Sequence, residues 1–153
     1  MKKYELLKDD TIDFLGKTLF RIKALISFKG IRKGEIGGYV EAERNLSQSG
    51  NAWVCDDARV SDDARVSDDA RVSDNAWVSG NAWVETSNDY IVFKNNWSSF
   101  RWFTYTKSNK MWRAGCFYGT GQELVEKAYK DSDESGRKYE LYVNLVKELY
   151  RDE

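Results

Sequence analysis

The sequence predicts a mainly β protein, in which a β-solenoid stands between an N-terminal β cap and a small C-terminal α+β unit. Valine recurs at every sixth residue from Val54 to Val84, and alanine stands two residues before each of these valines. A repeat of six residues is too short for a helical repeat unit and indicates a β-solenoid. The period is lost on both sides, so we expect three parts: residues 1–36, 37–86 and 87–153.

Residues 1–36 are expected to form strands that cap one end of the solenoid. The stretches YELLKDD, TIDFLGK and TLFRIKALISF are rich in β-forming apolar residues. The expected breaks between strands are at Asp9-Asp10, Gly16-Lys17 and Gly30. An uncovered solenoid end is an exposed sheet edge that invites association, so a cap is needed there.

Each six-residue unit of the repeat predicts one short strand and one turn. A period of two within the strand places alanine and valine on the same inner face, and the Trp or Arg between them points outward. A Ser-Gly-Asn, Ser-Asp-Asp or Ser-Asp-Asn triplet then supplies the turn, because these residues tolerate left-handed backbone. Two looser members, Val40 and Leu46, precede the clear repeats in the register of the alanines.

Residues 87–153 are expected to begin with three antiparallel strands, in the stretches DYIVFKN, SFRWFTYTKSN and KMWRAGCFYGT, with a turn at Ser108-Asn109. The last two strands interleave basic and aromatic residues, namely Arg101, Trp102, Trp112 and Arg113. Such strands can bind single-stranded nucleic acid. Aromatic packing under helices is the commoner arrangement and is the one expected here. Cys116, within an apolar strand, is expected to be a buried thiol.

Two helices are expected to finish the chain. Thr120 and Glu123 form a capping-box pattern, which predicts a helix to about Lys130. The stretch DSDESG should break it, and a second helix should run from about Arg137 to Tyr150. The residues expected to face inward are Leu124, Val125, Ala128 and Tyr129 in the first helix, and Tyr142, Leu145, Val146 and Leu149 in the second.

The composition argues against several classes of partner. The net charge of -1 gives no basic field for duplex nucleic acid or an anionic membrane. No apolar run approaches the ~20 residues of a membrane helix, and the first residues lack the apolar core of a signal peptide. The two cysteines stand in no spacing motif, which suits a reducing compartment. We therefore expect a cytoplasmic protein that binds neither membrane nor duplex nucleic acid.

Charge is nevertheless distributed unevenly along the chain. Residues 1–34 contain nine Lys or Arg and four Asp or Glu, whereas residues 49–84 contain three Arg and seven Asp. The chain has no histidine, which removes the commonest general base, every Ser-His or Cys-His pair and the His ligands of most catalytic zinc sites. The sequence therefore predicts a protein without catalytic residues, metal or cofactor.

The phrase VSGNAW resembles the hexapeptide repeat of left-handed β-helix proteins, in which three hexads make one triangular coil. The resemblance implies two to three coils here and a homotrimer with its solenoids side by side. The stretches KKYELLKDDTIDFLGKTLFRIKAL, KGEIGGYVEAERNLSQSGNAWV and AGCFYGT with ELVEKA extend it to a family of phage and prophage hexapeptide-repeat proteins. Members of that family are often labelled putative transferases.

A coil of three hexads would pair one tryptophan with one arginine in each outward column. The expected pairs are Trp53 with Arg71, Arg59 with Trp77, and Arg65 with Trp83. Guanidinium stacking on indole would stabilise these columns, and one interpretation is that they only keep the coils in register. Trp and Arg are also enriched at binding hot spots, so the same six residues are the candidate binding residues. On outward positions, the three tryptophans are expected to be exposed.

Three classes of function remain open at this stage. The favoured one is a non-catalytic phage-type binding protein that acts on a host component. It would be either an anti-defence inhibitor of a host protein or a sponge that sequesters a nucleotide signal. The alternatives are an enzyme like the hexapeptide acyltransferases and a structural component of a virion.

Overall fold

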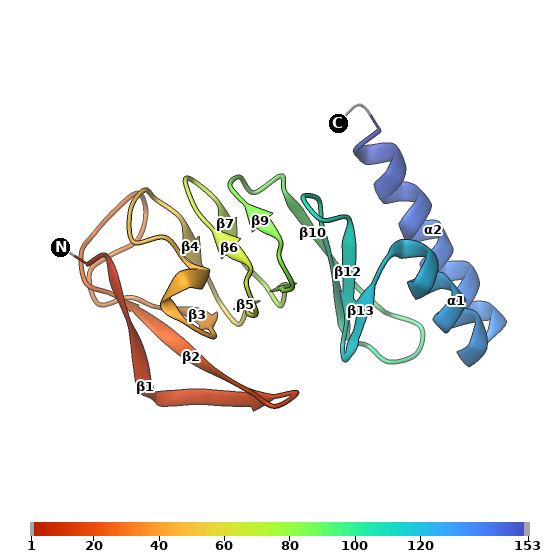
Figure 1. Cartoon of the computed structure of the whole chain (residues 1–153), viewed down its shortest axis with the longest axis horizontal. Helices are drawn as coiled ribbons and strands as arrows, with labels where there is room; N and C mark the ends of the chain where they lie inside the picture. The colour runs from red at the N-terminus through yellow and green to blue at the C-terminus, as the bar shows by residue number, and fades with distance from the viewer. Residues whose placement is uncertain (1, 152–153) are drawn as a thin grey trace.

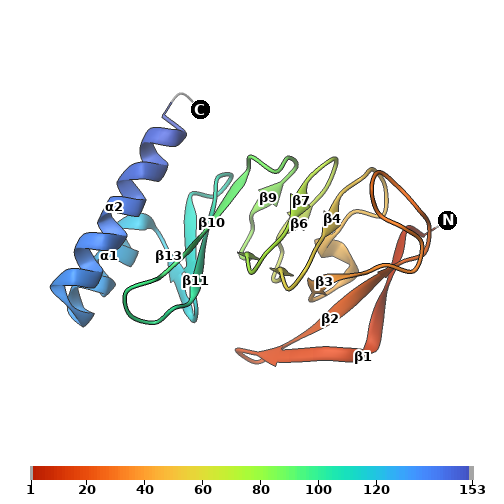
Figure 2. The same cartoon turned by 180° about the vertical axis from the view of Figure 1, so that it is seen from behind.

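The computed structural model describes residues 2–151. Residue 1 of the predicted N-terminal part and residues 152–153 of the predicted C-terminal part lie outside the described residues. Figure 1 shows an N-terminal hairpin that runs alongside the solenoid, then a small sheet, and last a pair of helices. The sheet stands between the solenoid and the helices, and the view from behind in Figure 2 shows the same order. No helix within residues 2–151 is long and apolar enough to span a membrane.

The hairpin consists of β1 (Tyr4–Phe14) and β2 (Lys17–Ala24), which pair in antiparallel fashion. Leu15 and Gly16 form the tight turn, with φ angles of 53° and 77°. The predicted break at Asp9-Asp10 is wrong, because β1 continues through these residues. They lie instead within a register shift, where the extra residues bulge out and the strand bends (Figure 1).

The solenoid begins at β3 (Ile36–Val40), which pairs with β2, and a 3-10 turn (Glu43–Asn45) follows. Six two-residue strands then each run from the Trp or Arg of a repeat to its valine. They are β4 (Trp53–Val54), β5 (Arg59–Val60), β6 (Arg65–Val66), β7 (Arg71–Val72), β8 (Trp77–Val78) and β9 (Trp83–Val84). Each pairs in parallel with the strand three hexads away, as β4–β7, β5–β8 and β6–β9, which confirms the predicted spacing.

The two looser repeat members lie two residues away from their predicted register. Val40 pairs with Val60, and Leu46 pairs with Val66, whereas the predicted partners were alanines. The additional residues follow Leu46, in a segment where the Gln48 amide holds the start of β1. Its oxygen accepts from the Lys3 backbone N–H at 2.8 Å, and its nitrogen donates to the Tyr4 carbonyl at 3.2 Å. The insertion therefore docks the hairpin onto the first coil.

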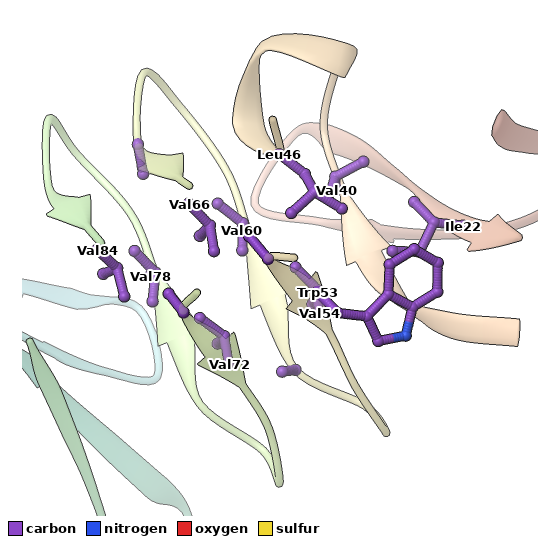
Figure 3. Close-up of a cluster of buried hydrophobic side chains, with 14 of the residues drawn as sticks. Ile22, Val40, Leu46, Trp53, Val54, Val60, Val66, Val72, Val78 and Val84 are labelled. Atoms are coloured by element: carbon purple, nitrogen blue, oxygen red, sulfur yellow. The ribbon is translucent and has the colours of Figure 1, made fainter. Parts of the chain in front are cut away.

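The alanines and valines of the repeat point into the solenoid and make its core (Figure 3). Every one from Ala52 to Val84 is fully buried. The predicted turns are confirmed, since one residue in each takes a positive φ. These residues are Gly50, Asp56, Asp62, Asp68, Asp74 and Gly80. Each repeat therefore supplies two small apolar residues to the core and polar residues to a turn at the corner of the coil.

Side chains from the flanking segments close both ends of the solenoid. At the first coil, the buried Lys3 ammonium donates to the Ala52 carbonyl at 2.8 Å, and burial together with Arg71 lowers the pKa of Lys3 to about 8. At the last coil, five backbone N–H groups donate to side-chain oxygens at 2.7–3.2 Å. The pairs are Arg71 with Ser87, Ser73 with Tyr90, Trp77 with Thr104, Trp83 with Ser108, and Glu85 with Asp89. Backbone groups that have no further coil to pair with are thus satisfied.

The C-terminal sheet has four strands where three were predicted: β10 (Tyr90–Lys94), β11 (Trp102–Thr106), β12 (Met111–Ala114) and β13 (Phe117–Gly119). Gly115, with a φ of 60°, turns the chain and splits the last predicted strand in two. Cys116 lies in that turn and is exposed, so the prediction of a buried thiol is wrong. The turn predicted at Ser108-Asn109 is confirmed.

The helices are α1 (Gly121–Asp131) and α2 (Asp133–Leu149), and they cover one face of the sheet. The capping box at Thr120 and Glu123 is confirmed. The break is only Ser132, which caps α2 by accepting from the Ser135 N–H, so α2 begins a turn earlier than predicted. Of the residues expected inside, Leu124, Ala128 and Val146 are buried, whereas Tyr129, Leu145 and Leu149 are exposed. Val143, not Leu149, completes the inner stripe of α2.

The hydroxyl cap of the last coil makes Thr104→Val a test of this architecture. The change keeps the shape but leaves the buried Trp77 N–H without an acceptor, which should cost about 1–3 kcal/mol of unfolding free energy. Thr104→Ser keeps the hydroxyl and should lose only about 0.8 kcal/mol for one methyl group. Urea unfolding of both variants measures the difference. Equal losses would show that the hydroxyl is not the cap.

Candidate functional site

The six predicted binding residues form the three expected columns on the solenoid. The pairs are Trp53 with Arg71, Arg59 with Trp77, and Arg65 with Trp83. Their surroundings differ, because other parts of the chain cover two of the three faces. The expected exposure of the tryptophans is therefore wrong for Trp53 and Trp77 and holds only for Trp83.

The face formed by β4 and β7 is covered by the segment that follows β2. Trp53 is fully buried, with the ring of Phe28 at 5.5 Å and that of Tyr4 at 6.3 Å. Arg71 donates to the Lys29 carbonyl of the same segment. A side chain at Gly37 would come within 2.8 Å of the Trp53 ring, so only glycine allows this close packing. This column is structural, since no ligand reaches its tryptophan.

The face formed by β6 and β9 is the open one. Arg65 is exposed, and Trp83 is 56% exposed. Beyond Trp83 the surface is a shallow hollow that continues onto the edge of the C-terminal sheet at Lys107, Ser108 and Met111. This face therefore keeps the accessible Trp/Arg character that the sequence predicted for all three.

The face formed by β3, β5 and β8 is enclosed by the hairpin and by the C-terminal sheet. Trp77 is only 7% exposed, and its Nε1 donates to Ser61 Oγ at 2.6 Å. The ring of Phe14, at the hairpin tip, lies 5.0 Å away in an edge-to-face contact. The guanidinium of Arg59 lies 5.8 Å from the Trp77 ring and 5.2 Å from the Phe14 ring. These contacts place one basic and two aromatic groups side by side.

A cleft of about 470 Å³ opens between this face, the hairpin tip and the sheet. Its aromatic walls come from all three parts, as Phe14, Trp77 and Trp102. Three arginines line it as well, Arg59, Arg101 and Arg113. Asp57 is the one acidic residue of the lining, and Arg21 holds its carboxylate at 2.8 Å. The cleft is therefore aromatic and positively charged.

Arg113 is the most enclosed of the three arginines, with 8% of its surface exposed. Its guanidinium lies 4.1 Å from the Trp77 ring and 5.3 Å from the Tyr118 ring. The Nε atom has no hydrogen-bond partner, and within residues 2–151 no carboxylate forms an ion pair with this side chain. Burial lowers the pKa of Arg113 from its usual value, and the nearby charge of Asp62 opposes that change.

Ion pairs fasten the hairpin over the solenoid and account for the uneven charge of the sequence. Lys17 pairs with Asp62, and Arg21 pairs with Asp57 while also donating to the Gly37 and Asp56 carbonyls. Although burial works against it, Lys17 and the Gly80 N–H lower the pKa of Asp62. The basic N-terminal segment thus neutralises acidic corners of the repeat.

Of the aromatic and basic residues that line the cleft, four were not among the six predicted binding residues: Phe14, Arg101, Trp102 and Arg113. The register of the sheet explains why some aromatic and basic residues of β11 and β12 face the solenoid while others pack under the helices. Thr104 pairs with Arg113, and both lie on the face toward the solenoid, whereas Trp112 is buried under the helices with Phe103. The expected aromatic packing thus describes Trp112 but not Trp102. Alternation within the two strands indicates this division once their register is known.

Comparison with known proteins concerns the repeat alone. A family model described as YdcK Beta solenoid repeat matches residues 58–73, 64–80 and 70–86. The three matches begin six residues apart, in step with the valine period, and support β-solenoid repeats over residues 58–86. No curated protein matches the chain.

The unequal cover of the faces predicts unequal effects of alanine substitutions. Trp53→Ala removes a fully buried ring and should lower the free energy of unfolding by about 3–5 kcal/mol. Trp83→Ala removes an exposed ring and should cost only about 0.5–1 kcal/mol. Denaturant unfolding measures both values. A loss at Trp83 as large as that at Trp53 would contradict the open-face assignment.

Proposed function

We propose that the chain is a non-catalytic binding protein whose cleft takes an anionic ligand with a planar ring, that is, a ligand of the nucleotide class. One observation carries the proposal: three arginines and three aromatic residues line a single cleft, while its one acidic residue, Asp57, is already paired with Arg21. Guanidinium groups bind phosphate oxygens in a planar, bidentate manner, and aromatic rings stack on bases. The volume of about 470 Å³ lies within the usual range for ligand pockets.

The resemblance to phage and prophage proteins supports a role inside a host cell. There, a protein that binds a nucleotide without turning it over would act as a sponge for a nucleotide signal in the cytoplasm. The second candidate function is inhibition of a host protein. The open face with Arg65 and the 56% exposed Trp83 favours it, since such residues are typical of protein interfaces.

The proposal ranks catalysis and a structural role in the virion below binding. The hexapeptide acyltransferases that the repeat resembles generally use a histidine base, and this chain contains no histidine. Fibre components generally carry longer repetitive shafts than residues 37–86 provide. The acyltransferase-like enzyme, with a Glu or Asp in place of the histidine base, is the alternative within the same fold.

We also propose that the solenoid is left-handed, with two to three coils, and that the protein is a homotrimer. The resemblance to the left-handed hexapeptide-repeat family supports both statements. The trimer now depends on one face of the solenoid rather than three, because Trp53 and Trp77 are buried within the chain. The β6–β9 face is the surface available for association.

Nucleotide binding is the first test. In calorimetric titration, nucleoside phosphates should bind to the purified chain. Trp102→Ala should weaken binding by about 1–3 kcal/mol through loss of stacking. Arg59→Gln should cost about 1.5–3 kcal/mol through loss of a charged hydrogen bond. Trp83→Ala, on the other face, should bind like the parent. Failure of every nucleoside phosphate to bind would refute the proposed ligand class, and equal binding by all variants would refute the cleft as its binding site.

Self-association is the second test. Sedimentation equilibrium at micromolar concentration should give three times the chain mass of 17.8 kDa. Trp83→Glu should shift the population toward monomer, because it replaces the exposed indole of the proposed interface with a charge. Its unfolding free energy should stay near that of the parent, as the position is exposed. A monomeric mass for the parent chain would exclude the trimer while leaving the cleft proposal intact.

A further inference from the structure

Two buried side-chain atoms within residues 2–151 have no hydrogen-bond partner, the Oγ atom of Ser79 and the Nε atom of Arg113. Ser79 directly follows β8, whereas Arg113 lies in β12 and lines the cleft. Buried polar atoms in folded proteins are nearly always paired, and an exception calls for an explanation. The guanidinium is the costlier of the two, since it carries charge.

The surroundings of Arg113 supply rings but no free negative charge. Trp77 and Tyr118 contact its guanidinium, and Arg59 brings a second positive charge to the same indole. Asp62 is the acid that influences it most, yet this carboxylate pairs with Lys17 and accepts from the Gly80 N–H at 3.0 Å. Cation–π contacts offset only part of the cost of burying a charge. The position is therefore unfavourable for the protein alone.

We propose that Arg113 is the phosphate anchor of the cleft, and that Arg59 completes the subsite from the solenoid side. This inference rests on the proposed function, because it concerns the same cleft. It identifies the phosphate as the part of the ligand that enters deepest. Arg113 is 8% exposed and Trp102 is 38% exposed, so the phosphate would lie at the enclosed end and the planar ring near the mouth.

The packing of Arg113 suits this role in a second way. Its guanidinium packs over the Trp77 indole, which limits the freedom of this side chain before a ligand arrives. A preorganised fork loses little freedom on binding and matches the oxygen geometry of phosphate, whereas a lysine ammonium at this position would offer only a point charge. A residue kept for binding at the expense of stability is expected to stabilise the fold when it is replaced by an apolar one.

The test uses three variants of the full chain and two readouts. Arg113→Met replaces the buried charge with an apolar side chain of similar length, and Arg113→Lys keeps the charge without the fork. Arg137→Met is the matched control, an exposed arginine on α2 at the far side of the sheet. The readouts are the melting temperature without ligand and the dissociation constants for inorganic phosphate, a nucleoside and its monophosphate.

The expected result concerns both the melting temperature and the dissociation constants. Arg113→Met melts at or above the parent temperature, and it binds phosphate and the monophosphate at least tenfold more weakly. Arg113→Lys folds and also binds at least tenfold more weakly. Arg137→Met matches the parent in both readouts. In the parent, the monophosphate binds at least tenfold more tightly than the nucleoside.

Other outcomes overturn the inference. If both Arg113 variants retain the parent affinity, the cleft binds nucleotides without this anchor and the proposed function survives. If the parent binds the monophosphate and its nucleoside equally, the cleft does not recognise phosphate, and the anchor fails together with the anionic ligand class. If both Arg113 variants fail to fold, the guanidinium is a structural group. If the parent binds neither phosphate nor any nucleotide, the proposed function fails together with the anchor.

Discussion

The structure depends on how a short parallel solenoid satisfies the backbone groups at its two ends. Within the coils, each strand donates its N–H groups to carbonyls of the following coil, as in Trp53 to Ala70 and Arg59 to Ala76. A solenoid with few coils leaves a large share of these groups at its ends, where they would invite association or lie buried unpaired. This chain closes both ends with side chains: Lys3 for carbonyls at one end, and hydroxyls such as Thr104 for N–H groups at the other.

The cleft is a consequence of this mode of closure. The C-terminal sheet docks onto the last coil through hydroxyl groups and does not continue the solenoid as another coil. One face of the sheet therefore points toward the solenoid, and some of its side chains extend past the point of contact. Thr104 makes the contact, while Trp102 and Arg113 on the same face line the cleft. The hairpin reaches the same place from the other end of the solenoid, since its tip residue Phe14 packs on Trp77. Segments far apart in sequence thus meet at one column of the repeat.

The repeat was predictable because a strict period fixes which residues face inward and which residues pair. The left-handed backbone at the turns follows from the Gly, Asn and Asp residues that recur there, whereas the pairing of strands three hexads apart is what the resemblance to left-handed β-helix proteins implies. Both are observed. Exposure was not predictable, because a local pattern distinguishes inner from outer positions but does not say what covers an outer one. Trp53 and Trp77 occupy equivalent outer positions to Trp83, yet distant segments bury the first two. The division of roles between Trp102 and Trp112 likewise required the register of the sheet.

The cleft is positively charged because the acidic residues around it already form ion pairs and hydrogen bonds elsewhere. Asp57, at a turn of the repeat, lines the cleft, and it and its neighbours Asp56 and Asp62 hold a corner of the solenoid or the hairpin. Asp56 accepts a hydrogen bond from the Asp74 N–H of the next coil, and Asp62 accepts one from the Gly80 N–H. Asp62 also forms an ion pair with Lys17, and Asp57 forms one with Arg21. With these carboxylates engaged, the arginines of the cleft keep their charge uncompensated. The same interactions that fasten the hairpin therefore leave the cleft positive, which is the property that a phosphate-bearing ligand would recognise.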